Sequence, residues 1–313
     1  MNHGMTEIME NQQEMVFASY VFPSVKSEIN AVLFLRSIRA FGGEFSDCPV
    51  WFFVPKIAES PTSVTSEIFS ELKAEVFQFD GIRGTDDFPF IGDSIAAAFA
   101  ENKAMKSNKL LAWLAANTLI LGEPKAFYLA ENKALGYRPV HHKLIGSPWR
   151  EPIDEFWKWV YDYCGVSSNS LFPMVGHIDG HRIRPYFNAG SIVLRPQHMV
   201  LQSWKDTFLE GYNDPRLQHF YSRNEKYAIF VHQAILSGVI LSRLRREELV
   251  ELPATYNYPL HLFFDDITND RRNTLDEYIT VRHEGFYQNE SWAHKLPAST
   301  QLKKWIAQSL IHQ

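Results

Sequence analysis

The stretch LLAWLAANTLILGEP, residues 110–124, contains two apolar runs separated by small and amide residues. The first run, LLAWL at 110–114, has the length and continuous apolar character of a strand buried on both faces of a sheet. Such strands are typical of parallel sheets, in which ligands bind beyond the carboxyl ends of the strands. At that end lie Ala115, Ala116 and Asn117. This turn is therefore the first place to look for a functional site.

The segments on either side alternate between strand and helix patterns. Upstream, the expected strands are 15–22, 48–55 and 75–80, and the expected helices are 27–41, 63–74 and 91–107. Downstream, we expect strands within 137–149, 186–196 and 247–260, and helices at 152–166, 197–209, 226–241 and 299–313. Alternation at short spacing is typical of βαβ units. The sequence therefore predicts an α/β fold with a central, mostly parallel sheet flanked by helices.

Composition excludes several classes of protein. The formal net charge is -5, whereas a broad nucleic-acid surface needs a strong basic excess, so we expect no nucleic-acid partner. No apolar run approaches the roughly 18 residues of a transmembrane segment, and the polar N-terminus has no signal-peptide core. The two cysteines, Cys48 and Cys164, are far apart in sequence and favour a reduced, cytoplasmic protein.

Four motifs suggest a family. They are LLAWLAANTLILGEP, YFNAGSIVLRP at 186–196, the passage from HQ at 232–233 to YNYP at 256–259, and VRHEGF at 281–286. In this order they resemble the nucleotide-sugar-dependent glycosyltransferases of the GT-A fold, especially the glycogenin-type retaining group. In that group the first motif carries Asp-x-Asp, where this chain has Ala115 and Asn117. His232 likewise stands where the group has Asp.

The resemblance implies a GT-A-like fold and transfer of a sugar from a nucleotide-diphospho-sugar donor to an unknown acceptor. It implies a single domain over 1–313, with a nucleotide-binding half at about 15–125, a sugar and acceptor half at about 126–295, and a C-terminal helix at 296–313. The substrate-binding residues that it implies are Asn117, Asn188, Gly190, Gln233 and His283. We expect Asn188, Gln233 and His283 to approach the same cleft as Asn117.

The first motif lacks the carboxylates that a metal would need. In the glycogenin-type group that the chain resembles, two Asp hold a Mg²⁺ or Mn²⁺ ion on the donor's phosphates. Such hard cations prefer anionic oxygen ligands. Ala115 offers no ligand, and Asn117 with His283 would offer only an amide oxygen and an imidazole. We therefore expect a lost or weakened metal site and little Mn²⁺ dependence. Cations that could stabilise the leaving group instead are Arg282, Lys295 and Lys143, the last with His141 and His142 beside it.

Each implied site residue also has a structural interpretation. Asn188 and Asn117 could cap turns, since Asn bonds nearby backbone. Gln233 could be a satisfied buried amide, and His283 a structural histidine. At the level of function, a catalytically inactive protein that binds a nucleotide, sugar or protein partner is the main alternative, and a metal-free sugar-nucleotide hydrolase or pyrophosphorylase is a further one.

A zinc site can be imagined at His177, Asp179 and His181. No Cys and no further spaced His completes it, so the pattern does not favour zinc. On an expected strand, His141 and His142 would point to opposite faces. Asp265, Asp266 and Asp270 are expected in a solvated loop.

Overall fold

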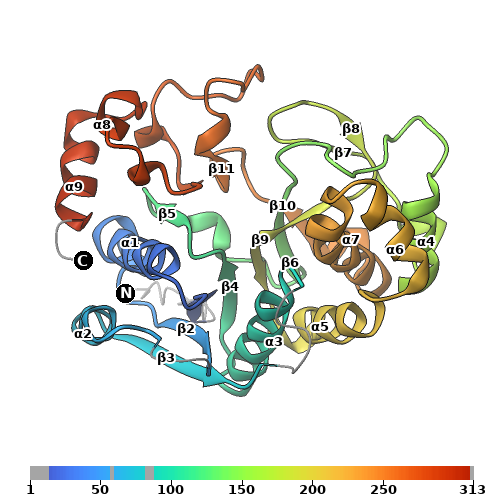
Figure 1. Ribbon diagram of the computed structural model, residues 1–313, viewed down its shortest axis with the longest axis horizontal. Coiled ribbons are helices and arrows are strands. Elements are labelled where there is room, and N and C mark those ends of the chain that lie inside the picture. The colour runs from blue at the N-terminus through green and yellow to red at the C-terminus, as the bar shows by residue number, and fades with distance from the viewer. Residues whose placement is uncertain (1–13, 57–59, 82–87, 311–313) are drawn as a thin grey trace, which may run out of the picture.

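The computed structural model describes residues 14–56, 60–81 and 88–310, and a seven-stranded sheet forms the centre of this part of the chain (Figure 1). Its strands, in spatial order, are β10 (Leu249–Glu251), β6 (Leu135–Pro139), β9 (Phe187–Leu194), β4 (Leu110–Leu114), β1 (Met15–Tyr20), β2 (Val50–Pro55) and β3 (Ala74–Phe79). Strand β9 runs antiparallel to both of its neighbours, and the other pairs are parallel. The predicted α/β class with a mostly parallel central sheet is confirmed, and LLAWL is the interior strand β4.

Helices cover both faces of this sheet. On one face lie α1 (Val25–Phe41) and α2 (Ser63–Glu71). On the other lie α3 (Ile91–Lys106), α4 (Glu155–Cys164), α5 (Val200–Gly211) and α7 (Lys226–Arg243), with α6 (Pro215–Arg223) beside α7. Strand β4 shows why both layers are needed. Leu111 and Trp113 pack on the α3 side, while Ala112 and Leu114 pack on the α1 side, so the strand is buried on both faces.

A smaller sheet adjoins the carboxyl end of β4. It consists of β11 (Tyr258–Pro259), β12 (Thr280–Arg282) and β5 (Thr118–Ile120), with β12 antiparallel to β5. The second apolar run of the opening stretch is thus not a continuation of β4 but β5. Around this sheet lie α8 (Trp292–Lys295) and α9 (Thr300–Leu310), which pack on a third apolar cluster. A two-stranded hairpin, β7 (Met174–Val175) with β8 (Arg182–Ile183), lies further along.

Two local predictions are wrong. The interpretation of Asn188 as a turn cap is wrong, because β9 begins at Phe187 and Asn188 is a strand residue. The pair His141 and His142 follows β6, which ends at Pro139, so these residues occupy a turn and are not forced to opposite faces. In both cases the strand boundary lies a few residues from the expected one. Pairing with neighbouring strands sets this boundary, and the local sequence does not.

Other boundaries shifted less. The predicted helix at 197–209 begins at Val200, after a short 3-10 turn at Pro196–His198. The predicted C-terminal helix is α9, and residues 1–13 and 311–313 lie outside the described part. Strands from both predicted halves join one sheet, although the single domain over 1–313 stays a prediction. Within the described residues, no helix has the length and apolar character needed to cross a membrane.

Candidate active site

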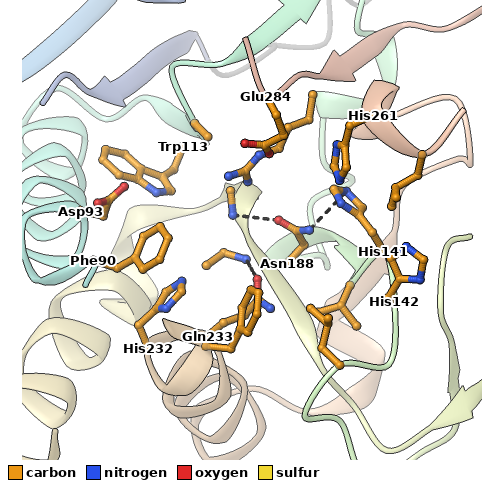
Figure 2. Close-up of a pocket in the computed structure, with 18 of the residues that line it drawn as sticks. Phe90, Asp93, Trp113, His141, His142, Asn188, His232, Gln233, His261 and Glu284 are labelled. Carbon is orange, nitrogen blue, oxygen red and sulfur yellow. Dashed lines mark hydrogen bonds between the residues drawn. The ribbon is translucent and has the colours of Figure 1, made fainter. Parts of the chain in front are cut away.

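A pocket of about 250 Å³ opens where β4, β9 and β12 meet the start of α3 and the middle of α7 (Figure 2). Most of its lining residues come from six segments: Phe90 and Asp93, Trp113 and Ala115, Val140 to His142, Asn188 to Gly190, His232 and Gln233, and Arg282 and Glu284. Trp204, His261 and Leu262 line it as well. His261 and Glu284 also line a neighbouring hollow formed with Gly285, Phe286 and Gln288. Because β4 ends here, the pocket has the position expected of a ligand site in an open α/β sheet.

The polar groups of β9 form the floor of the pocket. Asn188 is buried, and its Oδ1 accepts a hydrogen bond of 3.0 Å from the backbone N–H of Gly190. Its Nδ2 lies 3.4 Å from Nε2 of His141. Gly190 has a separate importance, because the guanidinium of Arg282 occupies the space that a Cβ would take. The absence of a side chain at 190 is therefore what lets Arg282 lie over the strand.

Helix α7 contributes two adjacent side chains with different tasks. The Oε1 of Gln233 accepts a hydrogen bond of 3.0 Å from the backbone N–H of Ala189, which fixes α7 to β9. His232 is buried, and its Nδ1 lies 2.8 Å from the carbonyl oxygen of Ile229. Burial lowers the pKa of His232 to about 3. The ring is therefore neutral near pH 7, with Nδ1 donating to the carbonyl and Nε2 left as an acceptor in the pocket wall.

Phe90 supplies an aromatic surface at an unusual backbone angle. It precedes α3 with a φ of 64°, a left-handed conformation that bulky residues rarely adopt. Its ring stacks on His232 with centroids 4.0 Å apart and an angle of 19°. Sparsely populated backbone conformations of this kind cluster at ligand sites. With Trp113 nearby, Phe90 gives one end of the pocket an apolar wall (Figure 2).

One guanidinium and two carboxylates set the charge of the pocket. Arg282 and Asp93 are half-buried, and Glu284 is exposed at the rim. Burial raises the pKa of Asp93 to about 7, against the opposing effect of Arg282. Burial also lowers the pKa of Arg282, which Glu284 and Asp93 partly offset. The guanidinium of Arg282 forms no direct hydrogen bond or ion pair with any residue that the structure describes.

Histidines line the opposite end of the pocket. The Nε2 of His141 lies 3.0 Å from the carbonyl oxygen of Asn257, so this nitrogen carries the ring proton. Burial holds the pKa of His141 well below its usual range, and the neighbouring His177 and His261 act in the same direction. The His141 ring is therefore neutral near pH 7 and does not supply positive charge to a ligand.

Asn117 and His283 lie against each other but outside the pocket wall. The Nδ2 of Asn117 donates to the carbonyl oxygen of His283. In return, the backbone N–H of His283 donates to the carbonyl oxygen of Asn117 at 2.9 Å. The His283 ring is fully buried against Phe286 and Tyr287, and burial lowers its pKa to about 3. Of the opening turn, Ala115 lines the pocket and Asn117 does not.

The structure thus brings together three of the five residues named from the sequence, Asn188, Gly190 and Gln233. Substrate binding by any of the five stays a prediction. Of the proposed cations, Arg282 lines the pocket, whereas Lys143 and Lys295 do not. Sequence reasoning missed Phe90, Asp93 and Glu284. A signal existed only for Glu284, which is part of the VRHEGF motif.

The donor set does not fit the Mg²⁺ or Mn²⁺ site that the resemblance implies. Asn117 has its amide N–H on a carbonyl, and Ala115 has no ligand atom. The Nδ1 of His283 accepts from the backbone N–H of Gly285 at 3.2 Å, so its Nε2 carries the proton and is buried. Among the described residues, no group of three or more His, Cys, Asp or Glu is arranged to hold a metal, including the segment with His177, Asp179 and His181.

Asp179 and its neighbours have a structural task instead. The Oδ2 of Asp179 accepts from the backbone N–H of Lys143 and lies 3.1 Å from Nδ1 of His181. Asp266, in the loop expected to be solvated, is buried and accepts from the hydroxyl of Tyr258 at 2.9 Å. These carboxylates fix loops near the pocket.

Comparison with known proteins identifies one family and several similar solved structures. Residues 18–240 match the family described as the Rhodobacterales glycosyltransferase domain. Among solved structures, mouse xyloside xylosyltransferase 1 in its apo form is similar at 12% identity, with a TM-score of 0.48 over 87% of this chain and 98% of that chain. An active-site mutant of LgtC is similar at 11% identity and a TM-score of 0.48, covering 94% and 95%.

The glycosyltransferase GlyE of Streptococcus pneumoniae is similar at 11% identity and a TM-score of 0.47, covering 96% of this chain and 60% of its own. No curated protein sequence matches the chain. The family match spans more than half of the 313 residues. The prediction of a glycosyltransferase is confirmed by this family match. The chain belongs to the Rhodobacterales glycosyltransferase domain family, and it is a glycosyltransferase.

Proposed function

We propose that the pocket binds a nucleotide-diphospho-sugar and that the sugar is transferred there to an acceptor hydroxyl. The observation that carries this proposal is the convergence of Asn188, Gly190 and Gln233, which are far apart in sequence, in one pocket at the carboxyl end of β4. The half at 15–125 is proposed to hold the nucleotide, and the half at 126–295 the sugars. Both halves contribute walls to the pocket.

The pocket walls suit a sugar. A pyranose has an apolar face of C–H groups and an edge of hydroxyls, so it needs an aromatic surface with hydrogen-bonding groups nearby. Phe90 and Trp113 provide the apolar surface. The Nε2 of His232 accepts a hydrogen bond from a hydroxyl because its ring stays neutral. We place the acceptor in the neighbouring hollow beyond Glu284, which opens from the same wall.

The test is a panel of UDP-, GDP-, ADP-, CDP- and dTDP-hexoses incubated with the purified chain, with nucleoside diphosphate release as the readout. Gln233→Glu is the informative variant, because it retains the acceptor oxygen for Ala189 and adds negative charge beside an anionic donor. We expect about tenfold weaker donor binding, since one like-charge contact is worth on the order of 1–2 kcal/mol at an intermediate dielectric. Gln218→Glu on the exposed face of α6 is the matched control.

The alternative of an inactive binding protein has its own signature. It predicts that calorimetry detects a nucleoside diphosphate in the pocket while no sugar nucleotide in the panel is turned over. If a correctly folded chain shows no turnover of any sugar nucleotide and no binding of a nucleoside diphosphate, the proposed function is overturned. The cytoplasmic location expected from the two cysteines stays a prediction.

A further inference from the structure

We infer that Arg282 is the catalytic cation of this pocket and that its guanidinium stabilises the departing diphosphate in place of a divalent metal. This inference rests on the proposed function, because it assumes a nucleotide-diphospho-sugar in the pocket. It goes further by naming the group that neutralises the leaving charge and by predicting metal-independent transfer.

The position of Arg282 is the first argument. Arg282 is the last residue of β12 and stands opposite Thr118 in the ladder with β5. The next backbone N–H, that of His283, bonds to the carbonyl of Asn117. Arg282 is therefore held beside the turn that follows β4, where the resemblance would put the carboxylate-bound metal. The chain has a cation at this place and lacks the ligands for a metal.

The second argument is the space made by Gly190. A Cβ at this position would collide with Nη1 of Arg282, so the guanidinium rests directly on the backbone of β9. Gly190 is additionally fixed from below, because its N–H donates to Asn188 and its carbonyl accepts from the N–H of Ala115 at 2.9 Å. The glycine thus acts as a positioning residue for the arginine, and its backbone has no left-handed angle that would demand glycine for another reason.

The third argument is that the guanidinium has no direct protein partner among the described residues. Asp93 and Glu284 are near enough to affect its charge but form no ion pair with it. Arginines that serve only structure usually spend their donors, as Arg184 does on the hydroxyl of Ser147 and the carbonyl of Glu151. The planar fork of Arg282 is left available, and this geometry matches two oxygens of a phosphate.

The step it assists balances as follows. The acceptor hydroxyl oxygen forms a bond to C1 of the donor sugar, and the bond between C1 and the β-phosphate oxygen breaks. The electron pair of that bond leaves with the nucleoside diphosphate, and the acceptor's hydroxyl proton passes to water. Negative charge grows on the β-phosphate oxygens as the bond breaks. A preorganised cation at that point lowers the barrier because it interacts more strongly with the β-phosphate oxygens in the transition state than in the bound substrate.

The first experiment compares Arg282→Ala, Arg282→Lys and the surface control Arg223→Ala in nucleoside diphosphate release. We expect Arg282→Ala to lose about 10²–10³-fold in kcat, as for removal of one group that stabilises developing charge. Arg282→Lys should retain part of the rate, since it has the charge without the fork. Added guanidinium should restore part of the rate of Arg282→Ala. A kcat of Arg282→Ala equal to wild type would overturn the inference.

The second experiment is a double-mutant cycle with Gly190→Ala. The added methyl meets the mobile end of an arginine side chain, so the fold should tolerate it while the guanidinium is displaced. We expect Gly190→Ala to lower kcat by about tenfold or more in wild type and to have almost no effect in Arg282→Ala. Equal losses in the two backgrounds would contradict the positioning role. Gly122→Ala, whose Cβ would meet only Ile279 within 3.5 Å, is the matched control.

The third experiment tests the metal directly. Wild-type turnover after EDTA treatment should change less than twofold on addition of Mn²⁺ or Mg²⁺, and a rise of tenfold or more would overturn metal independence. Failure of the proposed function looks different. In that case wild type neither turns over the panel nor binds a nucleoside diphosphate. If wild type only binds, calorimetry of Arg282→Ala still decides, because unchanged affinity for the diphosphate would remove Arg282 from the site.

Discussion

Two regions at the same edge of the sheet carry motifs of equal weight in the sequence but serve different ends. The turn at 115–117 is closed on itself and on β12, with Asn117 paired to the backbone of His283 in both directions. The edge of β9 at 188–190 is open on the pocket side, with Asn188 bonded inward to Gly190 and Arg282 lying above. The turn at 115–117 connects the large sheet to the small one, and the segment at 188–190 forms the pocket floor.

The difference shows what a missing carboxylate changes. Two Asp in a strand-end turn repel each other and need a cation, whereas a neutral amide can satisfy backbone groups without one. With Ala115 and Asn117, the turn needs no ion to be stable. In the proposed reaction, the cation that faces the donor is Arg282 on β12, which lines the pocket. In this proposal, Arg282 supplies the positive charge that a metal bound at the turn would otherwise supply.

Among changes to these two regions, placing one carboxylate in the turn should have the largest effect on turnover. Ala115→Asp would put an anion in the pocket wall near Arg282, where it can pair with the guanidinium and withdraw it from the donor. A hydrogen bond to a charged group is worth about 1.5–3 kcal/mol, so metal-free kcat should fall by about 10–100-fold. The uncharged Ala115→Asn is the control. Metal-free turnover of Ala115→Asp at the wild-type rate would separate the turn from Arg282.

The fold was predictable from the sequence because it depends on features that repeat along the chain. The apolar runs that became β1, β2 and β4 are buried on both faces, and that pattern survives any local error. Of the candidate residues named from the sequence, only some were placed correctly in the pocket. Asn188 and Gln233 face the pocket because β9 and α7 pair through Ala189. Asn117 and His283 turned to each other, a choice made by the pairing of β5 with β12 across more than 160 residues.

Asp93 and Phe90 mark the other limit of sequence reasoning. Both come from the start of α3, which carries no recognisable motif, and they reach the pocket because of where the sheet places that helix. The left-handed angle of Phe90 has no signature in the sequence, since neither glycine nor asparagine is present to suggest it. Residues of this kind are found from the structure alone.

The edge of β9 at 188–190 should lose measurable stability when its hydrogen bond to Gln233 of α7 is removed. Gln233→Leu removes the acceptor for the N–H of Ala189, in a buried position, and leaves that group unpaired. We expect a loss of about 1–3 kcal/mol in the free energy of unfolding, measured by urea denaturation. Gln218→Leu on α6 should change it by less than about 0.5 kcal/mol. Equal stability of Gln233→Leu and wild type would mean that α7 is not fixed to β9 in this way.

The closed turn should respond in stability and not in donor binding. Asn117→Asp exchanges the amide donor for an oxygen that faces the carbonyl of His283. We expect it to cost about 1–2 kcal/mol of unfolding free energy, with the affinity for a nucleoside diphosphate unchanged in calorimetry. Asn289→Asp is the matched control, because Asn289 uses only its oxygen, toward Ser291. A change in nucleotide affinity without a change in stability would return Asn117 to the site.

The smallest expected effect is a dependence of stability on pH that the pocket has and the turn lacks. The pKa of Asp93 is about 7 in the folded protein, above its ordinary 3.8, so the folded state holds this proton more tightly than the unfolded state. Stability should therefore fall as pH rises from about 4 to about 7 and then level off. Because the half-buried Asp93 side chain opens on the pocket, water screens part of this effect, so we expect a shallower slope than the shift in its pKa alone would give.

Asp93→Asn should remove part of that slope when thermal unfolding is followed at pH 5, 6 and 7. A remaining slope is expected from Glu101, whose pKa burial also raises to about 7 while it caps α5 through the N–H groups of Leu201 and Gln202. Asp162→Asn, on the exposed side of α4, should leave the wild-type slope unchanged. If Asp93→Asn and wild type lose stability in parallel over this range, the Asp93 carboxyl is hydrated in the folded protein, and the charge balance around Arg282 has to be redrawn without it.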